Sequence, residues 1–88
     1  MDKKKQLIDQ IKVVINKLEE EYAKDINSGV LKLLYSRYKK ALEILENNED
    51  IKRINILGGV RTYMDSYNDY QNTLLGELHK AEKLMQEL

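Results

Sequence analysis

Apolar side chains recur every three or four residues along the first part of the chain. This spacing gathers them within about 100° of a helical wheel and leaves only Val13 off the stripe. The pattern predicts an amphipathic helix from Asp2, a suitable N-cap, to about Asp25, where the turn-forming residues 26–29 begin. The members of the stripe are Leu7, Ile8, Ile11, Val14, Ile15, Leu18 and Tyr22.

The same spacing resumes after residues 26–29 and predicts a second helix, capped by Asn27 or Ser28. The polar run 47–50 ends it, because asparagine tolerates the left-handed geometry of a helix C-terminus. Two helices joined by a short connection lie antiparallel, so we expect an αα-hairpin. The second stripe consists of Val30, Leu31, Leu34, Tyr35, Tyr38, Ala41, Leu42 and Leu45, widened at one edge by Leu33 and Ile44.

The second half of the chain allows two interpretations. Ile51, Ile54 and Leu57 predict a short third helix, ended by the pair Gly58 and Gly59, which would act as a hinge. After the glycines, spacings of three and four residues predict one long C-terminal helix to Leu88, with room for a bend near Asn68. Its seam consists of Val60, Met64, Tyr67, Gln71, Leu74, Leu78, Ala81, Met85 and Leu88.

The alternative is a break within residues 66–73, most of which are mediocre helix formers, and this version gives a four-helix bundle. We prefer the long helix, because its apolar phase is unbroken across the same residues. Either way the sequence predicts an all-α antiparallel helical bundle, with residues 1–88 as a single domain. A long helix would overhang its partners, which favours a homodimer.

Composition excludes several classes of function. The 88 residues include 15 basic and 15 acidic side chains, so the net charge is zero and no nucleic-acid partner is indicated. The basic residues of the segment 37–40 point in different directions, and Glu43 and Glu46 follow closely. No apolar run approaches the roughly 20 residues that a membrane span requires. With no cysteine and no signal peptide, we expect a cytoplasmic protein.

Candidate chemistry is sparse, so we expect no enzyme. His79 is the only histidine, and Gly76 stands where a di-iron bundle motif needs glutamate, so no metal site is predicted. The serines lack the context of a nucleophile. The Gly58–Gly59 pair lacks the lysine and the third glycine of phosphate-binding loops. We therefore expect no cofactor and no small-molecule substrate.

Tyrosine usage is the most distinctive feature. All six aromatic residues are tyrosine, and Tyr63, Tyr67 and Tyr70 share one helical face beside Arg61. A tyrosine ring is apolar but its hydroxyl requires a hydrogen-bond partner, so an all-tyrosine set favours the margin of a core or a protein interface. Packing at the core margin is the simpler interpretation. As a candidate partner-binding site we take Arg61, Tyr63, Tyr67 and Tyr70.

The segment from Val30 to Leu45, with the short polar loop and Ile51 that follow, resembles the second helix and loop of the pediocin-like bacteriocin immunity proteins. The resemblance extends over residues 30–88 through helix spacing and lysine-rich, tyrosine-containing amphipathic character. It implies a small bacterial four-helix bundle without enzymatic activity, which protects a producing cell at a membrane sugar transporter.

Two functional hypotheses follow. The first is a small non-enzymatic protein that acts through protein–protein contacts or self-association. The alternative is a bacteriocin immunity protein.

Overall fold

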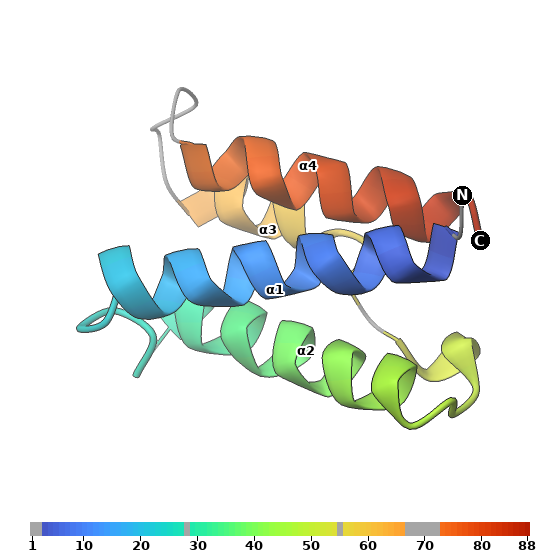
Figure 1. Ribbon diagram of the computed structural model, residues 1–88. Coiled ribbons are helices and arrows are strands. Elements are labelled where there is room, and N and C mark those ends of the chain that lie inside the picture. Colours follow the sequence, from blue (N-terminus) through green and yellow to red (C-terminus); the bar gives the residue numbers. More distant parts are fainter. Residues whose placement is uncertain (1–2, 28, 55, 67–72) are drawn as a thin grey trace.

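The computed structural model describes residues 3–27, 29–54, 56–66 and 73–88 (Figure 1). Within these ranges the helices are α1 (Lys3–Glu21), α2 (Gly29–Glu46), the 3₁₀ turn η1 (Ile51–Arg53), α3 (Gly59–Ser66) and α4 (Thr73–Gln86). Successive α-helices run in opposite directions, as Figure 1 shows. Both α1 and α3 pack against α2 and α4, which closes the ring of a bundle. The predicted all-α antiparallel bundle is therefore confirmed.

The predicted stripes of the first two helices supply most of the core, and residues between Ile54 and Ala81 supply the rest. Val13 is 43% exposed, as expected for a residue off the stripe. Leu33 is 42% exposed, so its assignment to the edge of the second stripe is wrong, whereas Ile44 is fully buried. The side chains that α1 and α2 bury are Leu7, Ile11, Val14, Ile15, Leu18, Leu31, Leu34, Tyr38, Ala41, Ile44 and Leu45.

The ends of the hairpin helices follow local hydrogen bonding. α1 ends at Glu21, four residues before the predicted end, because the amides of Asp25 and Ile26 both bond to the carbonyl of Tyr22 and close a turn. Asn48, just after α2, has a φ of 56°, the left-handed conformation predicted for this asparagine. Ser28, one of the two predicted caps of α2, lies outside the described residues.

The predicted short helix from Ile51 to Leu57 is wrong beyond its first turn. Only Ile51–Arg53 is helical, as a 3₁₀ turn. The structure buries Ile54 and Ile56 and leaves Leu57 46% exposed. The segment therefore links η1 to α3 and adds two isoleucines to the core.

The preferred long helix from Val60 to Leu88 is also wrong. The amide nitrogen of Val60 lies 2.7 Å from a carboxylate oxygen of Glu82. On one continuous helix, residues 22 positions apart would be separated by about 33 Å. α3 and α4 instead pack against each other as separate helices, so the four-helix version is correct. The bend expected near Asn68 lies outside the described residues, and the overhang that favoured self-association is absent.

The glycine pair begins a helix instead of ending one. Gly58 has a φ of +90°, a conformation that other residues rarely adopt. A Cβ added to Gly59 would lie 3.1 Å from the Cδ2 atom of Leu34, so the small residue lets the start of α3 approach α2 closely. The two glycines therefore turn the chain from Leu57 into α3.

Candidate functional site

The tyrosine face expected from the sequence does not present Tyr63 to a partner. Tyr63, on α3, is 2% exposed and belongs to the core, whereas Arg61 is exposed. Tyr67 and Tyr70 lie outside the described residues. α3 has only eight residues and packs against two helices, so the ring of Tyr63 fills space between them. The prediction that the tyrosines favour the margin of the core or an interface is therefore wrong for Tyr63.

A carboxylate from α4 holds the beginning of α3. Glu82 accepts hydrogen bonds from the amide of Gly58 at 3.1 Å and from the amide of Val60 at 2.7 Å. The first amides of a helix have no partner within the helix, and they carry partial positive charge. The side chain of Glu82 thus caps α3 from a position 22 residues further along the chain, and it fixes α3 against α4.

Tyr38 is a buried tyrosine within electrostatic range of Glu82. Its side chain is fully buried on α2, and its hydroxyl has no hydrogen-bond partner among the described residues. Burial raises the pKa of Tyr38 far above the ordinary value of tyrosine, and the nearby carboxylate of Glu82 raises it further. Because the ring is enclosed, no substrate reaches this phenol in the folded chain. Tyr38 belongs to the predicted apolar stripe of the second helix, and its burial confirms that assignment.

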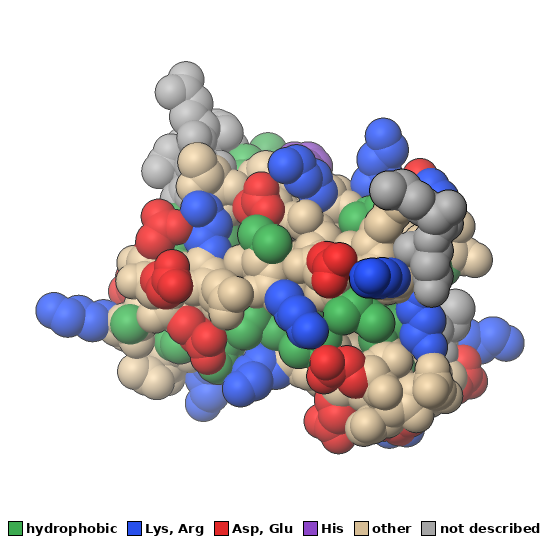
Figure 2. Space-filling view, viewed as in Figure 1, with side chains coloured by type: hydrophobic (Ala, Val, Ile, Leu, Met, Phe, Trp, Pro, Cys, Tyr) green, Lys and Arg blue, Asp and Glu red, His purple; other side chains and the backbone are tan. Residues whose placement is uncertain are grey.

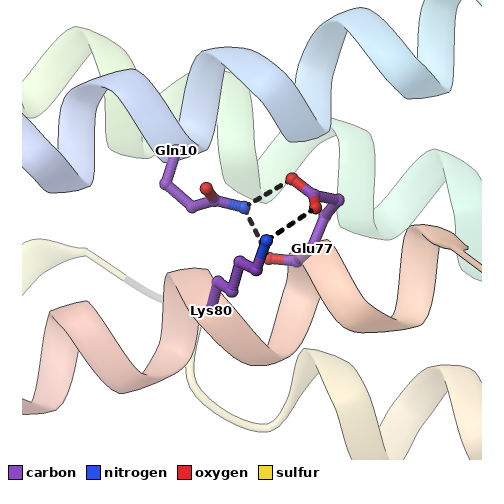
Figure 3. A network of polar contacts seen from close by, with 3 residues as sticks. All are labelled: Gln10, Glu77 and Lys80. Atoms are coloured by element: carbon purple, nitrogen blue, oxygen red, sulfur yellow. Dashed lines mark hydrogen bonds and ion pairs between the residues drawn. The ribbon is translucent and has the colours of Figure 1, made fainter.

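A polar network joins α1 to α4 (Figure 3). The amide nitrogen of Gln10 donates to the backbone oxygen of Glu77 at 3.0 Å and to its Oε2 atom at 2.9 Å. Lys80 approaches the other carboxylate oxygen of Glu77 at 3.4 Å. The network therefore fixes α4 against α1.

The face of the protein that includes α1 carries charged side chains of both signs. Figure 2 shows lysine, arginine, aspartate and glutamate side chains interspersed over the face that includes α1. A depression of about 300 Å³ on α1 is lined by Val13, Asn16, Lys17, Glu20 and Glu21. Its lysine is already paired, because Lys17 lies 2.8 Å from Glu21, and this hydrogen bond raises the pKa of Lys17. The lysine of this depression therefore finds its partner within the same helix, α1.

A larger open groove, of about 520 Å³, follows the outer side of α2. Its lining consists of two rows at helical spacing: Tyr35, Lys39, Leu42 and Glu46 in one row, and Ser36, Lys40, Glu43 and Asn47 in the other. We call this surface, lined by these eight residues, the α2 groove. Tyr35 and Leu42 are partly buried against the core, and the charged members are exposed or nearly so.

One end of the α2 groove is held in place by α1. The hydroxyl of Tyr35 donates to the carboxylate of Glu19 at 2.6 Å, and this hydrogen bond raises the pKa of Tyr35. The ammonium group of Lys39 lies 5.3 Å from the centre of the Tyr35 ring, within range of a cation–π contact. The groove is therefore a shaped surface, with an aromatic ring fixed from both sides.

Sequence reasoning missed the α2 groove. It assigned Tyr35 and Leu42 to the core stripe and treated Lys39 and Lys40 as scattered surface charge. The available signal was the pair of parallel rows at spacings of three and four residues, which places both lysines on the same outer surface as Leu42.

Comparison with known proteins identifies the family. Residues 1–88 match the family described as "YeeD uncharacterised protein". The "Uncharacterized protein YeeD" of Bacillus subtilis (strain 168) is 34% identical over 95 residues, which cover 99% of this chain and 93% of that protein. The chain belongs to the YeeD family. No solved structure matches it.

This assignment corrects the resemblance to pediocin-like bacteriocin immunity proteins. The YeeD family match covers the whole chain, whereas the resemblance was based on helix spacing and amphipathic character over residues 30–88. Many helical bundles share that spacing, because every amphipathic helix needs an apolar stripe. The immunity hypothesis is therefore wrong for this YeeD family member.

Two further properties concern the described part of this YeeD family chain. Within it, no group of three or more His, Cys, Asp or Glu side chains is arranged to hold a metal ion, and His79 is exposed. None of the helices in the described ranges combines the length and the apolarity that crossing a bilayer requires.

Proposed function

We propose that this YeeD family protein is non-enzymatic and acts by binding another protein chain along the α2 groove. The observation that carries the proposal is the composition of the groove: the aliphatic side chain of Leu42 lies between lysines and glutamates on an open helix surface, and the aromatic ring of Tyr35 lies one turn before the lysines. Interfaces commonly combine an apolar centre with a polar rim. The two rows of side chains form a furrow of the kind into which the side-chain ridge of another helix packs.

The distribution of titratable groups supports a protein without catalysis. The described groups with a raised pKa are Lys17, Tyr35 and Tyr38. The first two owe the shift to a hydrogen bond with a neighbouring glutamate on the surface, and the third is enclosed in the core. A catalytic site instead needs perturbed groups that converge on a cleft. The absence of cysteine from the sequence supports a cytoplasmic setting.

The α2 groove replaces the tyrosine face as the candidate surface. Tyr63 is buried, so the part of that face lying on α3 offers only Arg61 at the surface. The long seam proposed for dimerisation is divided between two helices that pack against each other. The groove on α2 retains an apolar centre that is open to solvent, which supports it as the place where a partner binds.

Site-specific photo-crosslinking tests this proposal in the native host. A photoreactive phenylalanine analogue is placed at Leu42, and a matched variant carries it at Val13, an exposed apolar position on α1. We expect the Leu42 variant to form a covalent adduct with a protein chain, identified by mass spectrometry, and the Val13 variant to form little. Adducts at Val13 but none at Leu42, or none at either position, would contradict the proposal.

A further inference from the structure

Basic and acidic side chains occupy different ends of the α2 groove. Lys39 and Lys40 lie toward the N-terminal end of the lining, and Glu43 and Glu46 lie toward its C-terminal end. A second copy of the same helix in parallel orientation would bring lysine against lysine. In antiparallel orientation it would bring both lysines of each copy opposite both glutamates of the other. We propose that the partner of the α2 groove is a second copy of this chain, paired antiparallel about a two-fold axis.

The lining places an apolar residue at the centre of such a pair. The midpoint between the lysine pair and the glutamate pair falls at position 42, and this position is Leu42. In a two-fold interface the same surface serves both copies, so the two Leu42 side chains meet at the axis. Each flank then contains the lysines of one copy and the glutamates of the other. The groove is thus complementary to itself in charge.

The charges in the centre of the groove are available for a partner. No ion pair within the described residues involves Lys40 or Glu43. Glu46 lies 3.8 Å from Lys12 of α1, a long contact between side chains that are both about half exposed. In the depression on α1, by contrast, Lys17 and Glu21 are paired within the chain at 2.8 Å. The charges of Lys40 and Glu43, which form no ion pair among the described residues, therefore distinguish the α2 groove from the depression with the paired Lys17 and Glu21.

The size of the surface indicates a weak dimer. A two-fold axis at position 42 of α2 (Gly29–Glu46) pairs residues 38–46 of the two copies, which is about 13 Å of helix, so a strip along this overlap covers about 150 Å² of each copy. Stable interfaces bury about 800 Å² per partner, and smaller ones belong to transient complexes. We therefore expect a monomer–dimer equilibrium with a dissociation constant of about 10 µM to 1 mM, weakened by salt because the ion pairs are exposed.

Charge reversal tests the pairing directly. Sedimentation equilibrium is measured from about 20 µM to about 2 mM at low ionic strength. We expect K39E/K40E alone and E43K/E46K alone to weaken dimerisation by about tenfold or more, because each homodimer then opposes like charges. An equimolar mixture of the two variants restores the dimer. So does the fourfold exchange K39E/K40E/E43K/E46K, whose groove is again complementary to itself in antiparallel orientation.

A matched control separates local pairing from net charge. K5E/K24E changes the net charge by the same amount as K39E/K40E, at two exposed lysines outside the groove, and we expect it to dimerise like wild type. Circular dichroism establishes that every variant is folded. Dimerisation of K39E/K40E with unchanged affinity would place the interface elsewhere and overturn the inference. Failure of the fourfold exchange to dimerise would overturn the antiparallel arrangement.

This inference rests on the proposed function, and the two fail in different ways. Wild-type protein that stays monomeric to about 2 mM would overturn the pairing with a second copy. If the Leu42 crosslink then captures a different protein, the function proposed above stands and only the identity of the partner is wrong. If the crosslink captures nothing as well, both are wrong.

Discussion

Replacing Tyr38 by phenylalanine is a sensitive test of the packing described above. The substitution keeps the ring that fills the space between α2 and its neighbours and removes only the hydroxyl. That hydroxyl is fully buried and has no hydrogen-bond partner among the described residues. A buried polar group without a partner destabilises the folded state by about 1 to 3 kcal/mol. We therefore expect Tyr38→Phe to stabilise the protein.

The cost of burying the unpartnered hydroxyl sets the size of the expected stabilisation. We expect the free energy of unfolding to rise by about 1 kcal/mol at neutral pH, the lower end of the range, because the ring loses one packed atom. For a chain of 88 residues the entropy of unfolding is about 185 cal/mol/K, so this gain raises Tm by about 5 °C.

The pH dependence gives a second, independent signature. Burial and Glu82 raise the pKa of Tyr38 in the folded chain, so the folded state keeps a proton that the unfolded chain releases above about pH 10. The contribution of Tyr38 to stability is therefore constant below the pKa that this tyrosine has in the unfolded chain, and it falls as pH rises above that pKa. Between about pH 8 and pH 10.5, Tyr38 accounts for a loss of about 0.8 kcal/mol. Tyr38→Phe removes that loss.

Urea unfolding followed by circular dichroism, at both pH values, measures the two effects. Tyr35→Phe serves as the matched control, because its hydroxyl is on the surface and is hydrogen-bonded to Glu19. We expect the control to change stability at neutral pH by less than about 0.5 kcal/mol. A loss of more than about 1 kcal/mol in Tyr38→Phe, with an unchanged dependence on pH, would show that the buried hydroxyl is satisfied and would refute the reasoning.

Three further predictions concern stability, and urea unfolding measures each of them. Glu82→Ala removes the carboxylate that caps α3, and we expect a loss of about 1 to 2 kcal/mol, against less than about 0.5 kcal/mol for Glu87→Ala, which breaks an exposed ion pair with Lys3. Equal losses would mean that Glu82 does not hold α3. Leu78→Ala empties a fully buried position on α4 and is expected to lose about 2 to 5 kcal/mol; a loss below about 1 kcal/mol would contradict the core assignment. Val13→Lys places a charge at an exposed position and is expected to change stability by less than about 0.5 kcal/mol, so a larger loss would mean that Val13 is covered.

The hairpin could be predicted from the sequence because its signals agree with one another. The apolar stripe of α1, the exposed Val13 and the left-handed Asn48 all follow from rules that act over one or two helical turns. Local periodicity and local turn chemistry are the parts of folding that a single sequence expresses directly.

The second half could not be predicted because periodicity does not distinguish a continuous helix from two helices that fold back. Val60 on α3 and Leu78 on α4 both face the core, so their apolar phase is the same in either arrangement. The deciding contact, from Glu82 to the amides of Gly58 and Val60, joins positions more than 20 residues apart. The mediocre helix formers within residues 66–73 were the better signal.

The candidate site was missed for a related reason. A residue such as Leu42 contributes to the core on one side and to an open surface on the other, and its spacing alone reports only the core. The buried Tyr63 illustrates the opposite error, since composition favours surfaces for tyrosine while α3, a short helix packed against α2 and α4, buries this large side chain. Which side of a helix stays open depends on how its neighbours pack.

Backbone NMR spectra recorded over a concentration series test whether this protein acts through contacts made by the α2 groove. From about 20 µM to about 2 mM we expect amide signals to shift progressively for residues that line the groove, with Leu42 and Glu43 among the largest changes, while those around Val13 stay constant. Shifts that cluster on any other surface would contradict this prediction. So would spectra that stay the same over the whole concentration range and also stay the same when the partner captured by the Leu42 crosslink is added.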